Sequence, residues 1–437
     1  MLDYVIFRFA EQTDKTSFIS LYFRRESIII IFFIVRKQEM EFLQKLKQSY
    51  LTKFWKPVPA VIALGILSAY YFGITGTYWA VTGEFTRWGG HFLQLFGVDV
   101  SSWGYYKLMS IEGNIFTRID GVMIIGMFAG CIAAAFWGNN VKFRMPVNKI
   151  RVYQALIGGI IAGFGARLGM GCNLASFFTG IPQFSFHAWV FTAFMMVGVY
   201  FGVKVALSPF FQSKIKMQKV SCSKSLPHNE EKVKNFFTLG TVVFLLIIVY
   251  ALYLIFIANS PKLGMAALFG ASFGLIIAKA QVCFTSAFRD IFTTGRSELA
   301  IAIIIGMVVA TLGVFTYLNM GATPKIFWTG PNVVIGGLLF GFGIVIAGGC
   351  ECGWMYRAVE GQVHFAIVGV GNIIGATLLA FVWDDISPTL ATSWPKINLL
   401  QSFGNYGGLI ANYGLLLLFF IVILVLEKKY LNKSRNR

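Results

Sequence analysis

Apolar segments of about twenty residues recur along the chain, and short polar segments separate them. A stretch of this length and character is what a helix needs to cross a lipid bilayer. The pattern predicts spans at 58–80, 119–137, 153–172, 185–207, 236–258, 264–283, 299–318, 332–350, 364–383 and 406–426. The ten-residue alternation of an outer-membrane barrel is absent. We therefore expect an all-α polytopic membrane protein with about nine or ten transmembrane helices.

Three polar segments directly follow apolar ones and are too polar and too short to continue a membrane span. They lie at 173–180, 280–295 and 351–361, and an apolar run resumes after each. Short polar segments persist at membrane depth only when they are buried in protein or line a wet cavity. We expect short re-entrant helices at these three places.

Two of these segments belong to an internal repeat. Shifting IGGIIAGFGARLGMGC (157–172) by 178 positions aligns it with IGGLLFGFGIVIAGGC (335–350), with eight of sixteen positions identical. Five crossings separate the copies, so the two membrane halves, 40–207 and 236–427, are expected to be inverted repeats. Inverted repeats of transporters place the substrate near the midplane, where broken helices meet.

Charge distribution predicts the orientation in the membrane. Only 13% of residues are charged, mean hydropathy is +0.69, and the net charge is +18. The Lys and Arg residues gather in short segments around 142–151, in a linker at 208–235 and in the tail 428–437. Basic segments between apolar runs mark the cytoplasmic side, which argues against nucleic-acid binding. Both termini are expected in the cytoplasm of a bacterial inner-membrane protein.

Three cysteines carry the candidate chemistry. Cys172, Cys283 and Cys350 each end an apolar segment and precede a polar one. A thiol in apolar surroundings stays protonated and donates a weak hydrogen bond to a soft atom, such as the sulfur or selenium of a small anion. A single buried cysteine is usually a small hydrophobic residue. A pair matched by the repeat, with a third in a similar setting, favours a substrate path.

Polar and glycine residues beside the cysteines are possible supporting groups. Charged residues at this depth are costly unless paired or wet. Arg289 with Asp290, and Arg357 with Glu360 or Glu351, are either structural ion pairs or sources of positive potential for an anion. The possible supporting residues are Cys352, Glu351, Arg289, Arg357, Gly171, Gly349 and Asn173. The scattered histidines and the absence of nucleotide-binding or hydrolase motifs predict no metal, no cofactor and no enzyme of those classes.

The first residues of the chain stand apart from the rest. The apolar stretch 27–35 is too short to span, and a basic amphipathic segment begins at Met40. Residues 1–39 are therefore either an extension before a start at Met40 or an interfacial anchor.

Four motifs resemble the YeeE/YedE family of membrane proteins, which includes thiosulfate transporters, and the match is nearest to its selenium-metabolism YedE branch. They are FGITGTYWAVTGEFTRWGG (72–90), GGIIAGFGARLGMGCNLASFFTGIPQFS (158–185), AQVCFTSAFRDIFTTGR (280–296) and GGCECGWMYRAVEGQVH (348–364). The resemblance implies an inner-membrane transporter in which Cys172, Cys283 and Cys350 pass the anion along by hydrogen bonding. It also implies a small cytoplasmic sulfur-carrier protein of the TusA-like kind as a partner.

Two departures from the family pattern bear on the substrate. Cys352 follows Cys350 closely, and Trp354, Met355 and Arg357 are bulkier than a simple thiosulfate pore needs. We expect an importer of a small sulfur- or selenium-containing anion, thiosulfate-like or a selenium species. The alternatives are a membrane-embedded transferase using a persulfide of Cys350 and Cys352, and a scaffold that recruits a TusA-like carrier.

Overall fold

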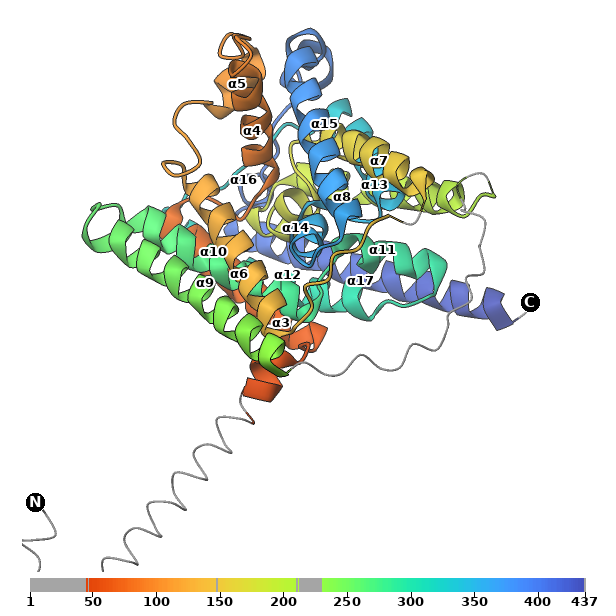
Figure 1. Cartoon of the computed structure of the whole chain (residues 1–437). Coiled ribbons are helices and arrows are strands. Elements are labelled where there is room, and N and C mark those ends of the chain that lie inside the picture. The colour runs from red at the N-terminus through yellow and green to blue at the C-terminus, as the bar shows by residue number, and fades with distance from the viewer. Residues whose placement is uncertain (1–44, 46, 147, 210, 212–229, 436–437) are drawn as a thin grey trace, which may run out of the picture. The chain divides into compact units, whose positions relative to one another are not determined.

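The computed structural model describes residues 45, 47–146, 148–209, 211 and 230–435 (Figure 1). The chain divides into two units, Met1–Lys53 and Phe54–Arg437. In the first, the described part contains one short helix, η1 (Lys47–Thr52). The predictions for residues 1–39 and for most of the linker 208–235 lie outside the described residues.

The second unit is built from long apolar helices. Among the described residues, ten helices are long and apolar enough to cross a membrane. They are α3 (Pro57–Thr75), α6 (Ile119–Trp137), α7 (Lys149–Leu168), α8 (Phe186–Ala206), α9 (Glu230–Phe256), α10 (Pro261–Ala280), α12 (Glu298–Asn319), α13 (Pro331–Ala347), α15 (Val363–Ser387) and α17 (Asn405–Arg435). Each overlaps one predicted span, and the described residues form no β-strand beyond isolated bridges. The prediction of an all-α polytopic membrane protein is confirmed.

After each of α3, α7, α10 and α13, the next element along the chain is a short helix that bears on the site. Three occupy the predicted polar segments: η2 (Asn173–Phe178), α11 (Phe284–Thr293) and α14 (Glu351–Val359). The fourth, α4 (Thr82–Gln94), was not expected from the sequence. The smaller elements are α5 (Gly104–Met109), η3 (Ile181–Gln183), η4 (Pro388–Thr392) and α16 (Leu399–Phe403).

Three of the long helices end in the same backbone conformation. Met170, Gln281 and Gly348 have positive φ angles of 56°, 51° and 80°, which a continuing helix cannot accommodate. Two residues further along, a cysteine in extended conformation serves as the N-cap of the next short helix. These cysteines are Cys172, Cys283 and Cys350. A left-handed residue two positions before each cysteine therefore makes the chain turn where the thiol is placed.

Helices α7 and α13 pack through glycines in a reciprocal way. A Cβ on Gly158 would lie 2.4 Å from the backbone nitrogen of Ala347, and one on Gly336 would lie 2.3 Å from that of Gly169. The 178-residue shift of the repeat converts one pair into the other, because Gly158 corresponds to Gly336 and Gly169 to Ala347. They also show that the helices run antiparallel, as the repeat predicts for this pair. For the two halves as wholes, inverted symmetry stays a prediction.

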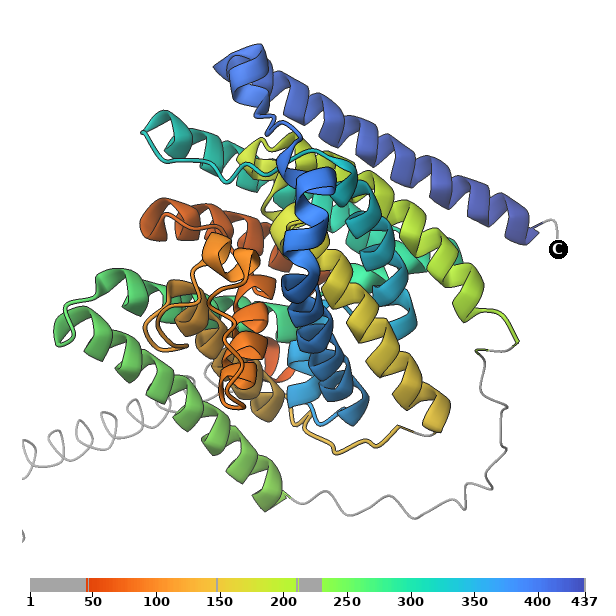
Figure 2. The ribbon, with the colours of Figure 1, turned by 90° about the horizontal axis from the view of Figure 1, so that it is seen from above.

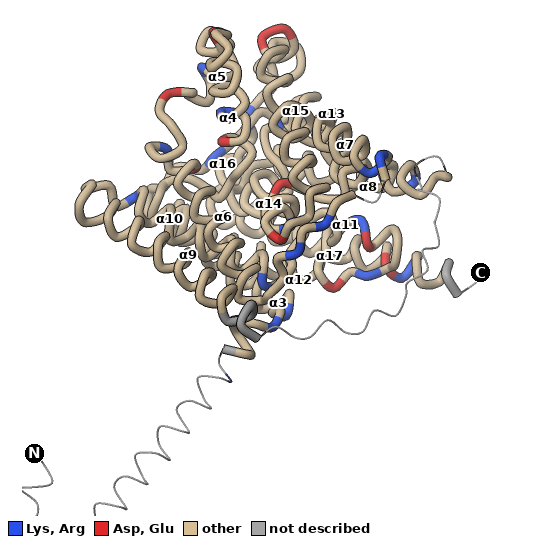
Figure 3. The backbone as a smooth tube through the Cα atoms, in the orientation of Figure 1, with Lys and Arg blue, Asp and Glu red and all other residues tan. Residues whose placement is uncertain are grey.

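The outermost helices identify the lipid-facing edges of the second unit. Only 22% of the apolar window of α9 and 17% of that of α17 are buried. Figure 2 shows these two helices along opposite edges of the bundle, with α7 and α15 between them. Acidic residues gather at the end of the second unit where α5 and the end of α15 lie (Figure 3). There the backbone N–H of Gly104 donates to the Asp384 carboxylate at 2.8 Å.

Candidate functional site

The three predicted cysteines sit at the starts of three different short helices. Cys172 and Cys283 are fully buried, and Cys350 is 2% exposed. All are free thiols, as is the neighbouring Cys352. The breaks in α7, α10 and α13 thus bring sulfur atoms into the interior of the bundle instead of leaving them on lipid-facing surfaces.

Cys283 and Cys350 form a pair although 67 positions separate them in the sequence. Their thiols lie next to each other. A Cβ built on Gly353 would lie 3.0 Å from the Cys283 sulfur and 3.6 Å from the Cys350 sulfur. Gly353, one turn into α14, therefore leaves open the space that both thiols face.

Cys172 belongs to a second group of polar side chains. The Glu351 carboxyl and the Thr82 hydroxyl lie next to its thiol. Asn372 of α15 donates its Nδ2–H to Glu351 Oε1 at 3.0 Å. Arg167 of α7 donates to Thr82 Oγ1 at 3.3 Å. A guanidinium, a hydroxyl, a thiol, a carboxyl and an amide thus follow one another at the break in α7.

Cys352 connects the two groups. It lies in the first turn of α14, near Cys172, Glu351 and Cys283. Its side chain is 2% exposed. Four thiols from three short helices therefore form one cluster, which we call the thiol cluster: Cys172, Cys283, Cys350 and Cys352.

Several fully buried polar atoms at the cluster have no hydrogen-bond partner in the described chain. They include Glu351 Oε2, Arg167 Nε and both polar atoms of the Asn173 amide. Asn173 and Glu351 are equivalent in the repeat, and each is 1% exposed. Buried polar atoms are normally paired, so these mark a place suited to a polar ligand.

The two predicted glycines shape the turns before the cysteines. A Cβ on Gly171 would lie 2.1 Å from Ser176 Oγ, and one on Gly349 would lie 2.8 Å from the Phe365 ring. No larger residue fits either place without moving its neighbour. Their role here is steric: they let the chain fold back against the short helix that follows.

The two predicted arginines differ in their partners. Arg289 pairs with Asp290 at 2.8 Å. Among the described residues, Arg357 is not within ion-pair distance of Glu351 or Glu360. Its Nε donates to Tyr356 Oη at 3.0 Å and its Nη1 to the carbonyl of Gly348 at 3.3 Å. It also interacts electrostatically with Cys283 and Cys350.

Comparison with known proteins identifies the family. A model of a family described as "Sulphur transport" matches residues 17–201 and 279–437, well over half of the chain. The chain is a member of the sulphur transport family. A protein named "Probable transporter YedE" from Escherichia coli strain K12 is 60% identical over 391 residues, covering 90% of this chain and 97% of its own. The homologue of that name from Salmonella typhimurium strain LT2 gives the same values.

A more distant relative shares only part of the chain. The "Thiosulfate transporter TsuA" of Spirochaeta thermophila is 37% identical over 79 residues, 18% of this chain and 24% of its own. The named relatives are transporters. This member of the sulphur transport family is accordingly a multi-pass membrane transporter, and the prediction that it is not an enzyme is confirmed.

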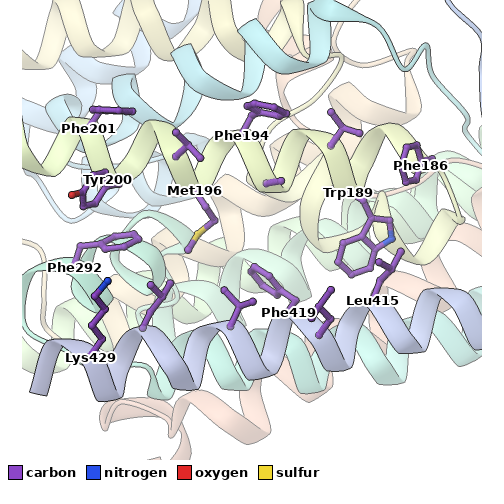
Figure 4. Close-up of a pocket in the computed structure, with 16 residues that line it drawn as sticks. Phe186, Trp189, Phe194, Met196, Tyr200, Phe201, Phe292, Leu415, Phe419 and Lys429 are labelled. Carbon is purple, nitrogen blue, oxygen red and sulfur yellow. The ribbon is translucent and has the colours of Figure 1, made fainter. Parts of the chain in front are cut away.

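An apolar groove of this sulphur transport family member lies away from the thiol cluster. It runs between α8 and α17 and has a volume of about 870 Å³ (Figure 4). Apolar side chains such as Trp189, Leu415 and Phe419 line it, and Lys429 lies at one end. An apolar wall of this kind suits hydrocarbon and not a small anion.

Sequence reasoning missed three residues beside the thiols. Thr82 and Asn372 lie beside the Cys172 group, and Arg167 donates to Thr82 Oγ1. One signal for Asn372 was present, because it is a lone amide within an otherwise apolar run. Thr82 carried no comparable signal, since its position depends on α4, which was not expected.

Proposed function

We propose that this transporter imports a small sulfur- or selenium-containing oxyanion, with thiosulfate and a related selenium anion as its substrates, along the thiol cluster. The observation that carries the proposal is that Cys172, Cys283 and Cys350, distant in sequence, meet in one buried cluster with unpartnered polar atoms. The names of the TsuA relatives support thiosulfate as the anion.

The chemistry of the cluster suits such a substrate. Protonated thiols donate weak hydrogen bonds to the soft terminal sulfur, and they avoid the repulsion that thiolates would exert on an anion. The first turns of α11 and α14, which begin after Cys283 and Cys350, add backbone N–H groups and the positive end of the helix dipole. Asn173 and Arg167 supply further donors for the oxygen atoms.

The proposed path is ordered by the fold. An anion enters beside Thr82 and Cys172, passes Cys352, and reaches Cys283 and Cys350. Arg357 lies near this pair and attracts the anion onward. Each step exchanges one hydrogen-bond donor for the next, so no covalent bond forms or breaks.

Location and partner complete the proposal. The distribution of basic residues supports a bacterial inner-membrane protein with both termini in the cytoplasm. The imported sulfur or selenium would then be available to a TusA-like carrier protein on that side.

The experiment that tests this function is uptake in cells that lack their own transporters. Radiolabelled thiosulfate and selenite are offered separately to cells with the wild type, Cys350→Ala, or the triple alanine variant of Cys172, Cys283 and Cys350. We expect uptake of at least one anion by the wild type and its loss in both variants at equal protein level. Undiminished uptake in the triple variant would refute the thiol path.

A further inference from the structure

We propose that a pocket lined by four arginines, Arg144, Arg151, Arg289 and Arg357, is a second anion site at the cytoplasmic end of the path. It would receive the oxyanion released by Cys283 and Cys350 before the anion enters the cytoplasm. The inference rests on the proposed function and adds to it a binding site with its own residues. The pocket has a volume of about 410 Å³, enough for a small oxyanion with bound water.

Arg357 joins this pocket, which we call the arginine vestibule, to the thiol cluster. Its guanidinium lines the vestibule and also interacts with Cys283 and Cys350. It is held by Tyr356 Oη, by the carbonyl of Gly348 and by the Phe365 ring, whose centroid lies 4.8 Å from its Cζ. A fixed guanidinium that faces both sites gives an anion a continuous attraction from one to the other.

Backbone pairing holds Arg144 at the vestibule. Its N–H donates to the carbonyl of Gly361 at 2.8 Å, and its own carbonyl accepts from the N–H of Val363 at 3.1 Å. Gly361 has a φ of 88°, and a Cβ there would lie 2.6 Å from the carbonyl oxygen of Lys142. The loop that carries Arg144 is therefore attached directly to the turn after α14.

Arg151 and His364 complete the opposite wall. Arg151 lies in the first turn of α7, and His364 Nε2 contacts the carbonyl of Ala347 at 2.8 Å. Both line the vestibule, and both lie next to helices that carry the thiols. Basic side chains from α7, α11, α14, α15 and one loop thus converge on one cavity, and Figure 3 shows Lys and Arg gathered around α11.

The vestibule is positive because its arginines outnumber the acids near it. No Asp or Glu is among its described lining residues. Asp290 pairs with Arg289 and offsets its charge, which leaves the net positive charge to Arg144, Arg151 and Arg357. Glu360 accepts from Gln281 Nε2 at 2.8 Å and from Gln362 Nε2 at 3.3 Å, and burial raises the pKa of its carboxyl. Guanidinium groups bind oxyanions through paired N–H donors, so the class of ligand follows from the lining.

The test is transport measured separately from each face of the membrane. Thiosulfate uptake is followed into inside-out and right-side-out vesicles that contain the wild type or the double variant Arg144→Gln/Arg151→Gln. Both side chains are exposed, so the double variant is expected to fold normally. Loss of charge-assisted hydrogen bonds should raise KM about tenfold in inside-out vesicles and leave KM unchanged in right-side-out ones.

A matched control separates a site from a general charge effect. Lys142→Gln removes one charge from the same loop, but Lys142 does not line the vestibule. We expect it to leave both KM values at the wild-type level, and Arg144→Lys/Arg151→Lys to restore part of the lost affinity. Three results would overturn the proposed anion site. They are an equal effect of Lys142→Gln, an unchanged KM of the double variant in inside-out vesicles, and a KM shift confined to right-side-out vesicles.

Failure of the underlying function gives a different result. If the wild type carries thiosulfate from neither face, the proposed substrate is wrong whatever the variants do. If the wild type transports thiosulfate and the arginine variants match it from both faces, only the vestibule is wrong.

Discussion

Replacement of Gly353 by alanine would insert one methyl group between two thiols without changing any chemical group of the path. The new Cβ would lie 3.0 Å from the Cys283 sulfur and 3.6 Å from the Cys350 sulfur, whereas ordinary van der Waals contact begins at 3.4 Å. The Cys283 side must therefore give way by a few tenths of an ångström. The space that both sulfurs face is filled by the methyl group.

The expected cost falls on transport more than on folding. Overpacking a buried site typically costs about 1–3 kcal/mol. Alanine in place of glycine within a helix stabilises the folded state by about 1 kcal/mol, and Gly353 lies within α14. These terms largely offset each other, so the amount of folded protein should change little. An anion that must touch both sulfurs loses its place, and a loss of about 1.4 kcal/mol in the limiting step already lowers uptake about tenfold.

The assay is initial uptake of radiolabelled thiosulfate, normalised to folded protein in the membrane. Gly414→Ala is the matched control, because a Cβ there meets nothing within 4 Å. We expect the control to transport like the wild type and Gly353→Ala to lose at least nine-tenths of its rate, the tenfold loss worked out above. Wild-type uptake by Gly353→Ala would refute the argument that the substrate passes between Cys283 and Cys350.

Three further substitutions probe other parts of the structure. Asn372→Leu removes the described donor to Glu351 and should lower the free energy of unfolding by about 1–3 kcal/mol, measured by thermal denaturation in detergent. If loss of this hydrogen bond is the cause, the double variant Asn372→Leu/Glu351→Leu should recover much of the lost stability. Glu84→Ala leaves Arg118 without its bidentate partner, so we expect a loss of about 3–5 kcal/mol in the same measurement, and an unchanged melting curve would contradict this. Cys131→Ala should leave thiosulfate uptake at the wild-type rate, because this thiol contacts the Gly274 carbonyl between α6 and α10; a large loss would require extending the path.

The positions of the helices could be predicted because hydrophobic length is a strong signal. For α6 the predicted and observed bounds coincide at 119 and 137. The breaks at Cys172, Cys283 and Cys350 could also be predicted, since polar residues interrupt apolar runs there. The repeat added a second, independent reason to expect a break at two of these cysteines.

Other features depend on tertiary contacts that no local pattern records. Helix α4 has few apolar residues, and Arg87 and Arg118 stabilise it by converging on the buried Glu84 carboxylate. For Arg357 the sequence left open an ion pair with a nearby acid or a source of positive potential, and its described partners are a tyrosine hydroxyl, a carbonyl and an aromatic ring. Cys283 and Cys350 meet because two separate helices end at the same depth, and the sequence of either one alone does not show this.

The glycine contacts between α7 and α13 limit which movements the transporter can make. Gly165 faces the backbone nitrogen of Phe340, and Gly343 faces that of Ala162, in both cases with 2.5 Å between that nitrogen and the position of a Cβ. Two main chains this close cannot slide by a residue without a side chain colliding with the opposite backbone. A transport cycle in which α7 slides along α13 is therefore incompatible with these contacts, and we expect the two helices to move together as one unit.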